Sequence, residues 1–99
     1  MDLSSRFLRS ISATALIAAS VSLGSSVKAG AREHNGAVYV IAVNASRTTP
    51  ASATITVPAV GNRPLRSLDG AHALTAKGGS FTDSLGPLEV RVYVASPPA

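Results

Sequence analysis

The side chains of this 99-residue chain that could do acid–base chemistry are few. Among its five carboxylates, Glu33 and Asp83 are the pair we consider for hydrolysis by two carboxyl groups, which must stand about 5–9.5 Å apart across a cleft. We expect instead that Glu33 is a solvated charge at a strand end and that Asp83 accepts hydrogen bonds from loop N–H groups or from an arginine. Because so small a domain offers little concave surface, no catalytic residue is predicted.

Metal and cofactor chemistry has little support in the residue types present. His34 and His72 are the two histidines, and Glu33 or Asp69 could join them as ligands, but none of these residues has the spacing of a metal motif. The chain has no cysteine, which excludes disulfides, thiolate metal sites and a cysteine nucleophile. Gly78-Gly79 is followed by no predicted helix, so it is not a phosphate-binding loop. We therefore predict no metal and no cofactor.

Two features bear on sugars. Asn44-Ala45-Ser46 is a formal N-glycosylation sequon, although we favour the alternative that the asparagine ends a strand and caps its own turn. The second feature is aromatic: Tyr93 is expected to point outward, where it could stack on a sugar, whereas Tyr39 and Phe81 are expected to lie in the core or to pack on a sheet. Aromatic residues are 4% of the chain, which is too few for a sugar-binding platform, so a carbohydrate ligand remains an alternative only.

The charge distribution argues against nucleic acid as a partner. Nine Lys and Arg against five Asp and Glu give a net charge of +4, and the basic residues after position 30 are scattered. Nucleic-acid binding needs clustered cations, commonly with aromatic residues for stacking. The 45% hydrophobic content, with only 14% charged residues, is typical of a globular chain built on Val, Ile, Leu and Ala.

From Val27 onward the hydrophobic pattern alternates with a period of two, which indicates strands. Asn35-Gly36 lies between two such runs and predicts a type I′ hairpin turn. The expected strands are 27–34, 37–44, 53–57, 65–68, 71–75, 80–85 and 89–94. About seven short antiparallel strands separated by turns predict an all-β fold, a small β-sandwich over residues 27–96.

Two strands carry expectations about which face is buried. The run 37–43 is apolar at every position, so we expect a central strand covered on both faces. In 89–94 we expect Val90, Val92 and Val94 to face inward, and Arg91 and Tyr93 to face outward.

The first 26 residues permit more than one interpretation. Arg6 and Arg9 precede an uncharged stretch, which fits either a helical segment that links to another domain or a signal peptide cleaved near Ala29 or Ala31. A signal peptide would make the protein secreted or periplasmic. Stable membrane insertion is disfavoured because serines interrupt the apolar stretch.

Two segments in the right order carry a family resemblance. Residues 32–44, and about 35 residues later 79–93, resemble the C-terminal all-β domain that follows the (β/α)₈ catalytic barrel in many glycoside hydrolases. The matching positions are Gly36, Tyr39, Asn44, Phe81, Asp83, Leu85, Pro87, Val90, Val92 and Tyr93. Residues 5–16 resemble the last barrel helix, so the resemblance presents the chain as the tail of such an enzyme.

The resemblance implies a non-catalytic accessory domain whose partner is a glycoside hydrolase barrel, in the same chain or a separate one. Its role would be to pack on the barrel and stabilise it. The barrel carries the two catalytic carboxylates of such enzymes and this chain does not contain it, so no catalytic residue is transferred. The alternative is a free-standing secreted β-protein that binds glycans.

Overall fold

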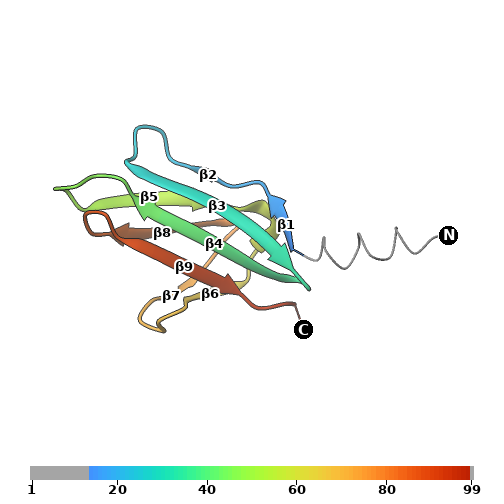
Figure 1. The fold of residues 1–99 in the computed structure, drawn as a ribbon. Helices are drawn as coiled ribbons and strands as arrows, with labels where there is room; N and C mark the ends of the chain where they lie inside the picture. Colours follow the sequence, from blue (N-terminus) through green and yellow to red (C-terminus); the bar gives the residue numbers. More distant parts are fainter. Residues whose placement is uncertain (1–13, 99) are drawn as a thin grey trace, which may run out of the picture.

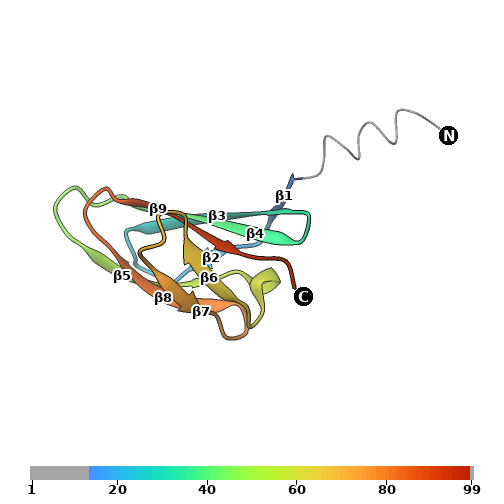
Figure 2. The same cartoon turned by 90° about the horizontal axis from the view of Figure 1, so that it is seen from below.

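A computed structural model describes residues 14–98 and forms a two-layer antiparallel β-sandwich, which confirms the predicted fold class (Figures 1 and 2). The large sheet has the order β1-β3-β4-β9-β6-β7 and the small sheet the order β2-β5-β8. The strands are β1 (Thr14–Ile17), β2 (Ser20–Val21), β3 (Val27–His34), β4 (Ala37–Asn44), β5 (Ala51–Thr56), β6 (Pro64–Ser67), β7 (Ala73–Thr75), β8 (Ser80–Leu85) and β9 (Val90–Ala95), with one 3₁₀ turn, η1 (Pro58–Val60).

The hairpin of β3 and β4 forms as the sequence predicts. Asn35 and Gly36 have φ angles of 51° and 85°, and a positive φ at both central residues defines a type I′ turn. β4 then pairs with β3 on one side and with β9 on the other, which places it inside the large sheet.

The core lies between the two sheets and is built from alternate residues of each strand. β4 contributes Val38, Val40 and Ala42, all fully buried. Two aromatic rings meet in the core, Phe81 of β8 and Tyr93 of β9, whose ring centroids lie 5.1 Å apart at an interplanar angle of 68°. This edge-to-face contact joins the small sheet to the large one.

The expected orientation of the last strand is wrong. Tyr93 is fully buried and Arg91 is 7% exposed, whereas Val90 is 60% exposed. The alternation of 89–94 separates two faces but does not say which one is inside. Tyr93 takes the inner face because it packs against Phe81 and its hydroxyl finds a buried partner in Asp83.

β4 is also not covered on both faces. Its inner residues are buried, but Ile41 on its other face is 38% exposed. The strand is central within its sheet, as expected, while its outer face has no second layer on it in the part of the chain described.

The expected helical or signal-like segment, residues 1–26, is described only from Thr14, and residues 1–13 lie outside the described part. From Thr14 the structure has strands in place of the expected helix: β1 pairs with β3 of the large sheet and β2 with β5 of the small sheet. Ile17, Ala19 and Val21 alternate and pack against the core. The cleavage sites near Ala29 and Ala31 fall inside β3, so cleavage there would remove both strands. Within residues 14–98 no helix has the length and apolar character needed to cross a membrane.

The turn before β8 supplies a stability prediction. A Cβ on Gly79 (φ +84°) would lie 2.6 Å from the Val57 carbonyl oxygen, whereas a Cβ on Gly78 (φ +59°) meets nothing within 4 Å. Both changes to alanine strain the backbone, but only Gly79→Ala also overpacks it. We expect Gly79→Ala to cost about 2 kcal/mol more than Gly78→Ala in urea unfolding of the full chain. Equal costs would contradict this packing.

Candidate functional site

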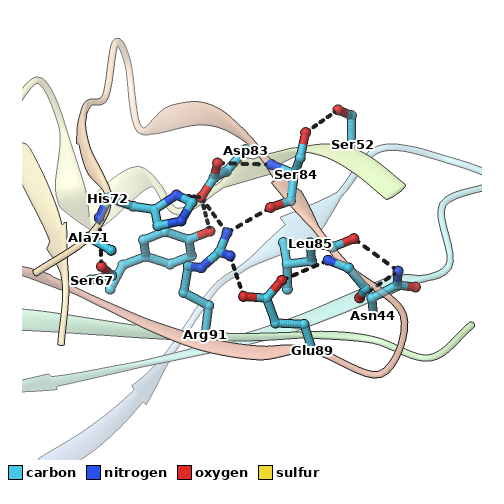
Figure 3. A network of polar contacts seen from close by, with 12 residues as sticks. Asn44, Ser52, Ser67, Ala71, His72, Asp83, Ser84, Leu85, Glu89 and Arg91 are labelled. Carbon is cyan, nitrogen blue, oxygen red and sulfur yellow. Dashed lines mark hydrogen bonds and ion pairs between the residues drawn. The ribbon is translucent and has the colours of Figure 1, made fainter. Parts of the chain in front are cut away.

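Five polar side chains meet in one place, which we call the interior polar cluster: His72, Asp83, Glu89, Arg91 and Tyr93 (Figure 3). Asp83 stands on β8 of the small sheet and faces Arg91 and Tyr93 on β9 of the large sheet. The cluster therefore spans the two layers at the side of the core.

Both oxygens of the Asp83 carboxylate accept hydrogen bonds. Its Oδ2 accepts the Tyr93 hydroxyl at 2.7 Å and an Arg91 N–H at 2.8 Å, and lies 3.2 Å from His72 Nδ1. Its Oδ1 accepts the Ser84 backbone N–H at 2.9 Å. Glu33, the carboxylate considered as its partner, lies on β3 of the other sheet and is not among these contacts. Asp83 is thus the hydrogen-bond acceptor expected from the sequence.

Arg91 occupies the centre of the cluster. Its guanidinium also donates to the Ser84 carbonyl oxygen at 2.7 Å and forms an ion pair with Glu89. Glu89 in turn accepts the Gly86 backbone N–H at 2.7 Å. One buried cation therefore holds β8, β9 and the turn between them.

The electrostatics suit a fixed ion pair better than proton transfer. Burial raises the pKa of the Asp83 carboxyl, but hydrogen bonds from Tyr93, Ser84 and Arg91 outweigh it and leave the pKa below its ordinary value. Burial and the adjacent Asp83 carboxylate raise the pKa of the Tyr93 hydroxyl far above its usual range. A general acid or base works best with a pKa near the working pH. At neutral pH Asp83 is charged and Tyr93 is neutral, which favours a structural cross-link.

The histidines are far from forming one site. His34 ends β3 and its Nε2 lies 3.2 Å from Asn35 Nδ2, whereas His72 follows the β6–β7 turn and contacts Asp83. Asp69 accepts the Ser67 hydroxyl and the Ala71 backbone N–H. Among residues 14–98 no three His, Cys, Asp or Glu side chains are grouped closely enough to hold a metal.

Asn44, the sequon residue, is fully buried. Its Nδ2 lies within hydrogen-bonding distance of the carbonyl oxygens of Thr49 (2.9 Å), Leu85 (3.2 Å) and Gly86 (3.1 Å), and its Oδ1 accepts from Ser26 and Ser46. The amide nitrogen that a glycan would occupy is therefore inside the fold. The asparagine caps its own turn, as one alternative proposed, and also ties that turn to the end of β8.

The outer faces of the two sheets differ in chemistry. On the small sheet, β5 and β8 carry a ladder of paired hydroxyls: Ser52 with Ser84 (2.8 Å), Thr54 with Thr82 (3.0 Å) and Thr56 with Ser80 (2.8 Å). Each hydroxyl has a cross-strand partner, and most of the ladder is exposed. Such a face is satisfied in water.

The outer face of the large sheet is apolar. Three cross-strand pairs of β4 and β9 point outward, and Leu68 adjoins them because its N–H donates to the Val92 carbonyl oxygen at 2.9 Å. Leu68 is 69% and Val90 60% exposed. We call these seven residues the outer apolar face: Tyr39, Ile41, Val43, Leu68, Val90, Val92 and Val94. Contiguous exposed apolar residues on a small domain mark an interaction surface.

The exposed charged residues on the strands beside the outer apolar face are basic. Lys28 and Arg32 of β3 and Arg66 of β6 are exposed on the same side of the sheet. Of the four carboxylates of the described part, Glu33 and Asp83 stand on inward-pointing strand positions, whereas Asp69 and Glu89 lie in turns at the border of the face. The alternation in the sequence separated the residues of the outer apolar face from those of the core, but it was interpreted with the valines of β9 inside.

With the fold in view, the chain is a two-layer antiparallel sandwich of a kind found within glycoside hydrolase structures. It is similar to part of a GH30 endoxylanase from Clostridium papyrosolvens (TM-score 0.69, 16% identity, 83% of this chain and 23% of that one). It is also similar to part of an Anoxybacillus alpha-amylase (TM-score 0.59, 20% identity, 75% of this chain and 16% of that one). The chain thus spans less than a quarter of either enzyme. No protein-family model and no curated protein matches the sequence.

Proposed function

We propose that this chain is a non-catalytic accessory domain that packs on the catalytic barrel of a glycoside hydrolase and stabilises it, in the same polypeptide or as a separate one. The observation that carries the proposal is the outer apolar face, because an isolated sandwich gains nothing from leaving Ile41, Leu68 and Val90 exposed beside four half-buried apolar side chains. The similarity to small parts of two glycoside hydrolases supports the class of partner.

The interior polar cluster supports the non-catalytic half of the proposal. The Asp83 carboxylate is ionised and already accepts hydrogen bonds from Arg91 and Tyr93, so a substrate would have to break the contacts that hold the two sheets together. Sugar stacking by Tyr93 is also not supported, since that ring is fully buried.

Site-specific photocrosslinking in the organism that makes the chain tests the proposal. A photoreactive phenylalanine analogue is placed at Ile41 on the outer apolar face or, as the matched control, at Thr54 on the hydroxyl ladder. We expect position 41 to crosslink to peptides of a glycoside hydrolase barrel and position 54 to give no such product. Capture of the barrel from position 54 alone, or of the chain itself alone from position 41, would contradict the proposed surface.

A further inference from the structure

Gly30 lies at a position where glycine is expected to destabilise its strand. It lies in the middle of β3, faces outward beside Ile41 of β4, and is flanked on its own strand by the outward Lys28 and Arg32. Glycine within a strand weakens it, because it gives up backbone freedom and offers no side chain to pack. A glycine inside a strand therefore needs a structural or functional reason that offsets this destabilisation.

Nothing within the described chain requires a glycine there. Its φ is not in the left-handed region, and a Cβ built on Gly30 would meet no atom within 4 Å. Gly79 is the opposite case, since its backbone conformation and the Val57 carbonyl both exclude a side chain. A glycine inside a strand often marks a bulge, a tight bend or a point where another molecule approaches the backbone closely, and the unbroken register of β3 with β4 at Gly30 excludes the bulge.

We propose that Gly30 is the seat of a partner helix: an α-helix lies over Gly30 and the outer apolar face, with an apolar side chain above the glycine and carboxylates at its flanks. The inference rests on the proposed function, because the outer surface of a (β/α)₈ barrel is a ring of helices. The row that runs from Gly30 through Ile41 and Val92 to Leu68 crosses β3, β4 and β9 and ends on the residue after β6. At about 4.8 Å per strand it is roughly 14 Å wide, which accommodates one helix of about 10–12 Å diameter.

Charge selects the helix over a second copy of this chain. Two copies packed by this face would place two sets of Lys28, Arg32 and Arg66 at the interface, whereas the nearest carboxylates, Asp69 and Glu89, stand at the border of the face and already accept hydrogen bonds within their own turns. A helix with Asp or Glu beside its apolar row would pair with these cations, which adds specificity and a faster encounter.

The variant Gly30→Val separates folding from docking. Valine suits a strand and has free space, so the melting temperature of the full chain should stay the same or rise by up to about 5 °C. The added isopropyl group stands where the partner helix must approach, so binding of the hydrolase should weaken about tenfold. Crosslinking from position 41 reads out binding, and Ser52→Val, which adds the same side chain to the opposite face, is the control.

Three results distinguish the proposed helix from its alternatives. The inference is supported if Gly30→Val keeps its stability and loses the crosslink, Ser52→Val keeps both, and the crosslinked peptides belong to an acidic surface helix of the hydrolase. It is overturned if Gly30→Val retains the wild-type crosslink to the hydrolase, or if the crosslinked peptides come from a loop. Absence of any hydrolase crosslink in the unsubstituted chain instead overturns the proposed function itself.

Discussion

Arg91→Met should remove about 3–5 kcal/mol of folding free energy, since this is the usual cost of deleting one partner of a buried ion pair. The substitution keeps much of the apolar length of the side chain but leaves the Asp83 carboxylate and the Ser84 carbonyl without their donor. A domain of this size has a total stability of about 5–10 kcal/mol, so much of it would be lost. Urea unfolding of the full chain measures the difference.

The matched control is Arg47→Met, because Arg47 is exposed in the link between β4 and β5 and should tolerate the same change within about 0.5 kcal/mol. The pH dependence adds a second criterion. The pKa of Asp83 is lowered in the folded wild type, so its contribution is present above about pH 4 and is lost as the pH falls through the folded value. In Arg91→Met, protonation relieves the unpaired carboxylate, so the deficit should shrink in acid. Equal losses for Arg91 and Arg47 would show that the cluster does not hold the sheets together.

Asn44→Asp should be similarly severe although it changes one atom of the side chain. The nitrogen that faces three carbonyl oxygens becomes an oxygen, so the hydrogen bonds of its two N–H groups are replaced by repulsion around a buried charge. We expect a loss of at least about 3 kcal/mol at pH 7.

The sign of its pH dependence distinguishes this mechanism from general damage. The new carboxyl would have a folded pKa above its unfolded value, so its protonated form is favoured in the fold; stability should therefore rise as the pH is lowered from 7 toward 5. Asn62→Asp is the control, because Asn62 is exposed and its oxygen, which remains, accepts the Gly78 N–H. If Asn44→Asp is as stable as Asn62→Asp, the buried position of the amide is wrong.

Local sequence patterns predicted much of the fold because hydrophobic alternation and turn residues determine the backbone conformation of short segments directly. The bounds of β3, β4 and β8 are as expected, and Asn35-Gly36 forms the type I′ turn that its residue types favour. Each of these features depends on neighbours in the sequence, where alternation and turn chemistry act directly.

What the sequence did not reveal depends on distant partners. Tyr93 and Arg91 are inside because Asp83, Phe81 and Ser84 stand on a strand of the other sheet. Residues 14–17 and 20–21 are strands because they pair with the edges of β3 and β5, although the sequence also allowed a helix there. Both outcomes follow from tertiary contacts that outweigh local preference.

The outer apolar face illustrates the same limit from the functional side. Valine at alternate positions of β9 predicts burial, and the prediction is wrong for the isolated chain while the proposed partner would make it right. An apolar side chain at alternate positions indicates that this face of the strand is covered, but it does not distinguish cover by the domain's own core from cover by another domain.

The thermal stability of the barrel identified by crosslinking tests the central claim most directly. It is measured with saturating wild-type chain, with the double variant Ile41→Thr and Val92→Thr, and with Thr54→Val and Thr82→Val on the hydroxyl ladder. If the outer apolar face supports the barrel, the wild-type chain and the ladder variant should raise its melting temperature by about 5–10 °C and the face variant should not. An equal rise with all three chains, or none with any, would contradict the account.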